Sequence, residues 1–326
     1  MLTPSMLAAT YEPGSTELHV REVPAPEPGS GEVRVRLAVS GVNPTDWKTR
    51  KRTPPPAETF LIPNQDGAGT IDAVGAGVSP DRVGERVWVL LGGRNDGWGT
   101  AAQYTVVPDH RAIPLPAEAS FELGASLGVP ALTASYCLNS DGPVAGRSVL
   151  VAGGAGAVGH AAIELARFED AARVIATVSG PEKAELARAA GAHTVNYRDP
   201  DAADQIRAAA PDGIDRFIEV ALHQNLELDL AVAAQYGVIV SYAADDSSVA
   251  QVPVRRLMVM DLTLRFMLLY TVAPQQLAAA VERTRAASAA GALTTLPLHR
   301  FTLDQIEQAH DAVEQGAVGK VVIDLP

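Results

Sequence analysis

The stretch VLVAGGAGAVGHAAIELAR, residues 149–167, constrains the fold of this chain more than any other feature of its sequence. Branched apolar residues typical of a buried strand lead into a glycine-rich turn, and apolar residues at helical spacing follow. The turn reads G-x-G-x-x-G, and in this position the glycines permit a tight turn, close approach of a ligand to the backbone and close packing of the helix on the strand. It therefore predicts a site for the pyrophosphate of a dinucleotide at a helix N-terminus. The residues assigned to this site are Gly153, Gly154, Gly156, Ala157, Val158 and Gly159. A glycine-rich structural turn is the alternative interpretation.

The turn belongs to a series of strand-like segments separated by spacers rich in alanine and leucine. Such alternation of strands and helices predicts a parallel sheet with right-handed crossovers. The predicted strands are 148–153, 173–178, 193–197, 215–220, 237–243 and 261–269.

The chain before this series has a different pattern. Short runs of alternating apolar and polar residues, such as EVRVRLAV at 32–39, are interrupted by Pro and Gly and predict an irregular β-rich domain. The C-terminal segment predicts two helices and a closing strand without βα alternation, so we assign it to this first domain. The predicted boundaries are 1–124 with 268–326 for the β-rich domain and 125–267 for the α/β domain, and two domains fit a length of 326 residues.

Charge and composition exclude several partners and sites. A net charge of -12 and a pI near 5.0 argue against nucleic acid or an anionic membrane as the main partner, because both need a basic surface. The single cysteine, Cys137, excludes an internal disulfide and a structural zinc site built on cysteines. The start of the sequence lacks a signal-peptide pattern, and no run of 18 apolar residues occurs, so we expect a cytoplasmic protein.

The end of the second α/β strand bears on the choice of cofactor. Folds that prefer NAD usually place Asp or Glu there, where the carboxylate accepts hydrogen bonds from the ribose 2′-OH. Here Ser179 takes that position and Lys183 follows one helical turn later. A hydroxyl and an ammonium suit a 2′-phosphate, which a carboxylate would repel, so the sequence favours NADPH. A solvated lysine beside Glu182 and Glu185 is the alternative interpretation of Lys183.

With these residues in view, the chain resembles the zinc-independent quinone oxidoreductase branch of the medium-chain dehydrogenase/reductase superfamily, the relatives of zeta-crystallin. The motifs that carry the resemblance are GVNPTDW, DGAGTIDAVG, AGGAGAVG, AAGAHTVNYRD and the terminal GKVVI. The resemblance implies a GroES-like β-rich catalytic domain interrupted by a Rossmann doubly wound parallel-sheet domain, with the active site in the cleft between them. It also implies that Thr133 lies near the nicotinamide, that 156–158 bind the pyrophosphate, and that Ser179, Lys183 and Tyr197 surround the 2′-phosphate.

Other branches of this superfamily are zinc-dependent alcohol dehydrogenases, so the metal positions need their own test. Their catalytic zinc takes a Cys where this chain has Asn43 and a His where it has Gln65. A neutral amide is a poor ligand for Zn²⁺ compared with a thiolate or an imidazole. We therefore expect no bound metal, and we expect reduction of an already electrophilic acceptor rather than oxidation of a simple alcohol.

The motif GVNPTDWKTR supplies the candidate catalytic residues, Asn43, Asp46 and Lys48. They match the region where zinc relatives bind their metal, so they are candidates for hydrogen bonding to the carbonyl oxygen of a substrate. The alternatives are structural: Asn43 before Pro44 holds a turn, and Asp46 caps the following helix. Relatives often carry Tyr at the position of Lys48, which leaves the role of that lysine open.

These observations predict an NADPH-dependent oxidoreductase that reduces a quinone or an α,β-unsaturated carbonyl compound without metal. The basic cluster at 48–52 keeps an enoyl-thioester reductase as an alternative, because a basic rim would attract an acyl phosphopantetheine. A non-catalytic NADP-binding protein is the other alternative. The apolar segment DLTLRFMLLY at 261–270 is predicted to end the parallel sheet, and an exposed apolar edge predicts a homodimer.

Overall fold

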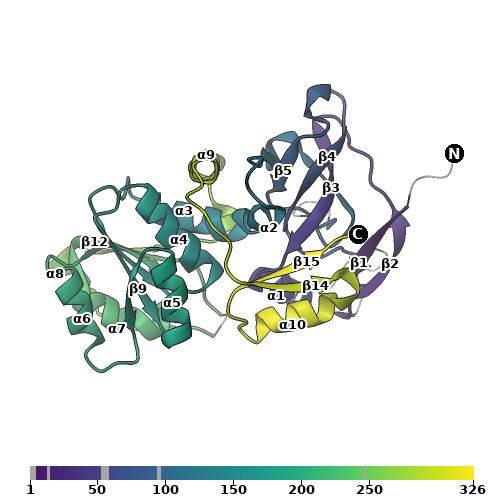
Figure 1. Ribbon diagram of the computed structural model, residues 1–326. Coiled ribbons are helices and arrows are strands. Elements are labelled where there is room, and N and C mark those ends of the chain that lie inside the picture. Colours follow the sequence, from purple (N-terminus) through teal and green to yellow (C-terminus); the bar gives the residue numbers. More distant parts are fainter. Residues whose placement is uncertain (1–4, 13–14, 53–58, 94–96, 246) are drawn as a thin grey trace. The chain divides into compact units, whose positions relative to one another are not determined.

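The computed structural model describes residues 5–12, 15–52, 59–93, 97–245 and 247–326. The chain forms two compact units, Met1–Val129 with Thr295–Pro326 and Pro130–Thr294 (Figure 1). We call them the β-rich unit and the nucleotide-binding unit. Each is described by itself below.

The β-rich unit contains two sheets, in which all strand pairs except β14–β15 are antiparallel. Its strands are β1 (Ser5–Thr10), β2 (His19–Pro24), β3 (Glu32–Gly41), β4 (Asp66–Val74), β5 (Arg86–Val89), β6 (Tyr104–Pro108), β7 (Ala112–Pro114), β14 (Leu298–Thr302) and β15 (Lys320–Asp324), and its helices are α1 (Pro44–Arg52), α2 (Phe121–Gly124) and α10 (Ile306–Glu314). Strands β1 and β2 form a hairpin, and a second sheet has the order β14-β15-β3-β4-β5-β7, with β6 also paired to β3. The alternating run at 32–39 forms β3, and its apolar residues Val33, Val35 and Leu37 are buried.

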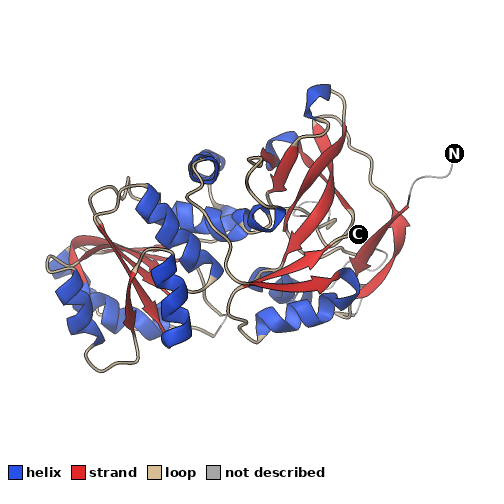
Figure 2. Cartoon of the chain, in the orientation of Figure 1, coloured by secondary structure: helices blue, strands red, loops and turns tan. Residues whose placement is uncertain are grey.

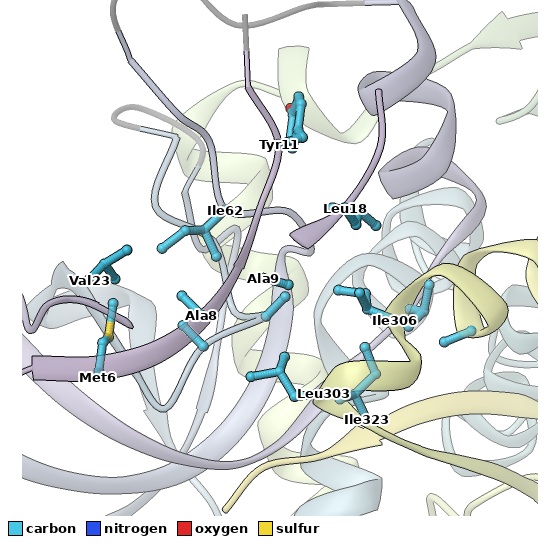
Figure 3. Packing of buried hydrophobic residues seen from close by; sticks show 14 of the residues in the cluster. Met6, Ala8, Ala9, Tyr11, Leu18, Val23, Ile62, Leu303, Ile306 and Ile323 are labelled. Atoms are coloured by element: carbon cyan, nitrogen blue, oxygen red, sulfur yellow. The ribbon is translucent and has the colours of Figure 1, made fainter. Parts of the chain in front are cut away.

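The core of this unit contains residues from both the N-terminal and the C-terminal segments of the chain. Met6 on β1 and Val23 on β2 belong to the same buried cluster as Ile306 on α10 and Ile323 on β15 (Figure 3). Burial of these side chains holds the C-terminal segment against the N-terminal hairpin, because apolar surface removed from water stabilises the fold.

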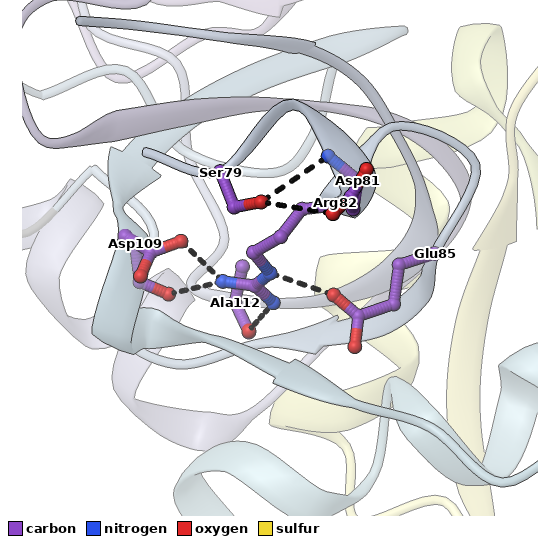
Figure 4. Close-up of polar contacts among 6 residues, drawn as sticks. All are labelled: Ser79, Asp81, Arg82, Glu85, Asp109 and Ala112. Carbon is purple, nitrogen blue, oxygen red and sulfur yellow. Dashed lines mark hydrogen bonds and ion pairs between the residues drawn. The ribbon is translucent and has the colours of Figure 1, made fainter. Parts of the chain in front are cut away.

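An arginine fixes the connection between β4 and β5 in the same unit. Arg82 donates from Nε to Oε2 of Glu85 at 2.6 Å and from Nη2 to the carbonyl of Ala112 at 2.7 Å, and its Nη1 also contacts the Asp109 carboxylate (Figure 4). Ser79 accepts a hydrogen bond from the backbone N–H of Asp81 and caps the short turn that carries the arginine. These contacts tie the turn to the start of β7.

The nucleotide-binding unit is a parallel sheet with helices packed against it (Figure 2). Its strands are β8 (Ser148–Ala152), β9 (Arg173–Val178), β10 (His193–Asn196), β11 (Ile214–Glu219), β12 (Ala233–Ser241) and β13 (Thr263–Phe266), and its helices are α3 (Leu132–Asn139), α4 (Ala157–Phe168), α5 (Pro181–Ala189), α6 (Ala202–Ala209), α7 (Leu222–Val232), α8 (Val254–Met260) and α9 (Pro274–Ala289). The strand order is β10-β9-β8-β11-β12-β13, so the chain starts in the middle of the sheet and winds outward in both directions. The predicted doubly wound parallel sheet is confirmed, and β13 forms one edge of it.

Both predicted boundaries of the α/β domain differ from those in the structure, most clearly at its C-terminal end. Helix α9 was assigned to the β-rich domain, but it packs on α3 and α4 in the nucleotide-binding unit. Its buried residues include Ala280, whose carbonyl accepts a hydrogen bond from Ser135 Oγ of α3 at 3.4 Å. The chain therefore returns to the β-rich unit at Thr295 rather than at 268, and it leaves that unit after Val129 rather than after 124.

In the part of the chain that the structure describes, no helix has both the length and the apolar character needed to cross a membrane.

Candidate functional site

The glycine-rich turn connects β8 to α4 at the point where the winding of the sheet reverses. Gly153 has a φ of +69°, a left-handed backbone conformation that would be strained for a residue with a side chain. A Cβ on Gly154 would lie 2.6 Å from the Cβ of Ala176, and one on Gly159 would lie 2.4 Å from the carbonyl oxygen of Gly153. These two glycines are therefore needed for close packing of the turn, β9 and α4, as the motif predicts.

Gly156 faces open space, unlike Gly154 and Gly159. It is exposed, and a Cβ there would meet only the carbonyl oxygen of Gly153 at 3.4 Å. It is also the N-cap of α4, and no side chain caps that helix end. The turn thus leaves the first N–H groups of a twelve-residue helix available to a ligand, with Ala157 and Val158 half-buried beside it, and it fits a pyrophosphate group.

The residues predicted to choose between NADPH and NADH lie at the ends of β9 and β10. Ser179 follows β9, Lys183 lies in the first turn of α5, and Tyr197 follows β10 with 41% of its surface exposed. No acidic residue takes the position of Ser179. The structure therefore places all three predicted residues at the same edge of the parallel sheet as the glycine-rich turn.

Arg198 is a candidate that sequence analysis missed. Its guanidinium carbon lies 5.6 Å from the centre of the Tyr197 ring, and Nη1 donates to the carbonyl of Ser179 at 3.4 Å. The cation therefore lies next to both predicted residues. The signal was present in the motif NYRDP, where the arginine directly follows the tyrosine.

Thr133, predicted to lie near the nicotinamide, is in the first turn of α3 and is buried. It belongs to the same unit as the glycine-rich turn. Its contact with a cofactor stays a prediction.

In the β-rich unit, Asn43 lies in the connection from β3 to α1, and its side chain is bonded at both ends. Its Nδ2 donates to Oδ2 of Asp66 at 2.7 Å, and its Oδ1 accepts from Nζ of Lys320 at 2.8 Å. Asp66 begins β4 and Lys320 begins β15, so residues from three distant segments meet here. All three side chains are buried. Sequence analysis proposed Asn43 but missed its two partners.

Asp46 joins this cluster through the backbone. Its Oδ2 accepts a hydrogen bond from the N–H of Asn43 at 2.7 Å. Asp46 is therefore inside the first turn of α1 and reaches back to the residue before the helix, rather than standing at the N-cap. Burial and the negative charge of Asp66 raise the pKa of Asp46 to about 8. Burial also raises the pKa of Asp66 and lowers that of Lys320, although the two groups favour each other's charged forms.

The backbone at Gly128 and Val129 lies close to the Asp66 carboxylate and holds its second oxygen. Its Oδ1 accepts a hydrogen bond from the N–H of Val129 at 2.8 Å. A Cβ on Gly128 would lie 2.0 Å from that same oxygen, so only glycine allows the chain to pass there. The Asp66 carboxylate is therefore fixed by one side-chain amide and one backbone N–H, each charge-assisted.

Lys48 lies outside this cluster. It is half-buried on α1, with its Nζ 5.6 Å from the centre of the Trp47 ring. Lys51 forms an ion pair with Glu314 of α10 at 2.6 Å, and Arg50 is buried and donates to the carbonyl of Thr16. Two members of the basic cluster at 48–52 therefore stabilise the unit itself.

The two positions where zinc-dependent relatives bind their metal, Asn43 and Gln65, have amide side chains in this chain. Gln65 is half-buried next to Asp66, and the Asn43 amide is bonded as described above. Among the residues that the structure describes, no three His, Cys, Asp or Glu side chains come together as ligands for a metal ion.

Comparisons with known proteins assign both units. The family model of the alcohol dehydrogenase GroES-like domain matches residues 29–117, and that of the zinc-binding dehydrogenases matches residues 157–286. A quinone oxidoreductase from Lama guanicoe is 30% identical over 308 residues, which cover 93% of this chain and 91% of the relative.

Solved structures agree with this assignment. A mycobacterial quinone oxidoreductase matches with a TM-score of 0.83 and 28% identity, over 98% of this chain and 100% of that one. A mycobacterial protein in complex with NADPH matches with a TM-score of 0.81 at the same identity and coverage. The predicted combination of a GroES-like domain with a Rossmann domain is confirmed. The chain is thus an oxidoreductase that uses a nicotinamide cofactor and a small-molecule substrate, and it belongs to the quinone oxidoreductase branch of the medium-chain dehydrogenase/reductase superfamily.

Proposed function

We propose that the protein uses NADPH to reduce a quinone or an α,β-unsaturated carbonyl compound, without a metal ion. The observation that carries the proposal is the set of groups after β9 and β10. A hydroxyl, an ammonium, a phenol and a guanidinium lie there, from Ser179, Lys183, Tyr197 and Arg198. These groups suit a phosphate dianion on the ribose, and the overall structural similarity to a protein solved with NADPH supports the same cofactor.

The remaining residues of the nucleotide-binding unit would hold the rest of the cofactor. Residues Gly153, Gly154, Gly156 and Gly159 form the turn, and the pyrophosphate would lie against 156–158 and bind the N–H groups of Ala157 and Val158. Thr133 is proposed to contact the nicotinamide end. When bound, NADPH supplies the hydride that the reduction needs.

In the β-rich unit, we assign to the Asn43 amide the role of hydrogen-bond donor to the carbonyl oxygen of the acceptor. A primary amide has two N–H donors, and the Asp66 carboxylate takes one of them. Lys320 fixes the other end of the amide by binding Oδ1, so the group is held in one orientation. Preorganised donors of this kind stabilise negative charge that develops on oxygen. Asp46 and Lys320 are positioning residues in this proposal, and a substrate contact of Lys48 stays a prediction.

We propose a reaction without metal because the side chains at the candidate ligand positions are poor ligands for Zn²⁺. Asn43 and Gln65 offer amides where zinc relatives offer a thiolate and an imidazole. The Asn43 amide is also already bonded to a carboxylate and an ammonium. A conjugated acceptor suits such a site, because delocalisation carries the negative charge to its oxygen without a Lewis acid.

No observation favours the enoyl-thioester alternative. That alternative rests on the basic cluster at 48–52, and Arg50 and Lys51 in that cluster bind groups of their own unit.

The experiment that tests the proposal is NADPH consumption with 1,4-naphthoquinone, an enone and an enoyl thioester, together with NADP⁺ reduction by ethanol. Reduction of the quinone or the enone is the expected result. Reduction of the thioester alone would favour that alternative, and cofactor fluorescence changes without consumption would favour a non-catalytic binder.

The assembly proposed with this function is a homodimer. The edge strand β13 and the adjacent helix α8 expose a group of large apolar side chains, with Met258, Val259 and Phe266 exposed by 73%, 67% and 69%. An unpaired strand edge flanked by apolar surface is suited to pair with a second copy of itself.

A further inference from the structure

A pocket lies on the nucleotide-binding unit at the edge of the sheet opposite the glycine-rich turn. Its volume is about 500 Å³, and it is lined by Arg167 at the end of α4, Arg173 at the start of β9 and His193 at the start of β10. The strands are parallel, so their N-terminal ends share this edge and their C-terminal ends share the other. Strands of five or six residues separate the two edges by about 17–20 Å.

Basic side chains line this pocket, although the chain as a whole has a net charge of -12. Among the described residues that line it, three have basic side chains and none has a carboxylate. Within the described residues, neither Arg167 nor Arg173 forms an ion pair. In contrast, Arg188 on α5 pairs with Glu185, and Arg207 on α6 pairs with Asp204.

The walls leave room for a ligand beside the two guanidinium groups. Gly191 has a φ of +103°, and a Cβ there would lie 3.3 Å from Nε of Arg167, so glycine lets the arginine lie along the turn before β10. Ala208 and Ala209 of α6 form another wall with small side chains. Gln205 adds an amide whose Nε2 donates one hydrogen bond to Asp201 and has a second hydrogen.

We propose that this pocket binds a small molecule carrying a phosphoryl group, at a site separate from the cofactor. Arginine suits such a ligand because its planar fork donates two parallel hydrogen bonds to phosphate oxygens. Two unpaired arginines and an imidazole around one pocket supply the charge, and the volume lies within the range of small-molecule sites, roughly 300–1,000 Å³.

The test is calorimetric titration of the full chain with inorganic pyrophosphate at constant ionic strength. The variant Arg167→Gln/Arg173→Gln should lose about tenfold to hundredfold in affinity, as expected for loss of charge-assisted hydrogen bonds. Two controls isolate the pocket. Arg188→Gln/Arg207→Gln removes the same charge from neighbouring helices, and saturating NADPH fills the cofactor site, so that pyrophosphate can bind only elsewhere. The pocket should keep its affinity for pyrophosphate in that double variant and in the presence of NADPH.

Unchanged NADPH affinity, measured by cofactor fluorescence, should show that the Arg167→Gln/Arg173→Gln variant is folded. The proposal is overturned if millimolar pyrophosphate does not bind the wild type, or if both double variants lose the same affinity. It is also overturned if saturating NADPH abolishes all pyrophosphate binding. The two arginines would then serve the C-terminal ends of α4 and α6, where positive charge is favourable.

Discussion

At the scale of single residues, the proposed choice of NADPH depends on cations at the ends of two strands. Lys183 on α5 and Arg198 after β10 are the positively charged candidates, and Arg198 already contacts Tyr197 and the carbonyl of Ser179. A neutral ribose hydroxyl gains far less from these charges than a phosphate dianion does. The two cofactors should therefore respond differently when either cation is removed.

Lys183→Ala should weaken NADPH binding by about tenfold to hundredfold and leave NADH binding nearly unchanged, because a hydrogen bond to a charged group contributes roughly 1.5–3 kcal/mol. Arg198→Gln should act in the same direction. Fluorescence titration of each variant with both cofactors measures the effect. Glu182→Ala, which alters an exposed neighbour on α5, is the matched control. Equal losses for NADPH and NADH would contradict the assignment.

Asn43→Ala should lower kcat by about 10²–10³ while leaving NADPH affinity intact, since losing one preorganised donor to a developing oxyanion typically costs that much. Steady-state kinetics and cofactor titration on the same preparation separate the two quantities. Lys320→Met leaves the Asn43 amide in place but removes the ammonium that orients it, so kcat should fall by less. A turnover unaffected by Asn43→Ala would remove Asn43 from the proposed mechanism.

At the scale of elements, β11 and α7 contain a buried pair of acids. Glu219 ends β11 and accepts hydrogen bonds from the Ala221 N–H and the Asn225 amide, and Asp229 on α7 is also buried. Burial raises the pKa of both groups, and the charge of Glu219 raises that of Asp229 further. The folded state therefore holds protons that the unfolded chain releases at its ordinary carboxyl pKa, about 4.

This pair should make the nucleotide-binding unit less stable as the pH rises. Its contribution is fully present below the unfolded pKa and is lost as the pH passes through the raised folded values. Asp229→Asn keeps the shape without the charge, so its melting temperature should exceed that of the wild type at pH 8 by more than at pH 5. Asp212→Asn, at an exposed loop position, is the control. Calorimetry over this pH range would contradict the account if both variants followed the wild type.

The sequence predicts some elements well and others poorly, for physical reasons. The six strands and the glycine-rich turn were predictable because their signals are local: apolar runs, glycine spacing and a following helix. The binding of Asn43 by Lys320 was not, because these residues are 277 positions apart and no local pattern joins them. Helix α9 was assigned to the wrong unit because its buried face consists of small residues, such as Ala280 and Ala287, which do not reveal what they pack against.

At the scale of the whole molecule, the exposed apolar surface of α8 and β13 predicts a homodimer. Light scattering should report twice the chain mass of 34.1 kDa. Met258→Lys/Phe266→Lys should shift the protein to the monomer, because it places charge at the exposed apolar edge. Val83→Lys, at an exposed apolar residue of the β-rich unit, should leave the dimer unchanged. A monomeric wild type at micromolar concentration would contradict this assembly.

The most direct measurement of the central claim compares initial rates of NADPH and NADH oxidation with 1,4-naphthoquinone, using protein dialysed against EDTA. The account predicts saturable oxidation that depends on the quinone, a kcat/KM at least about tenfold higher for NADPH than for NADH, and no change when zinc is added back. Preference for NADH, or activity that disappears with the chelator and returns with zinc, would contradict it.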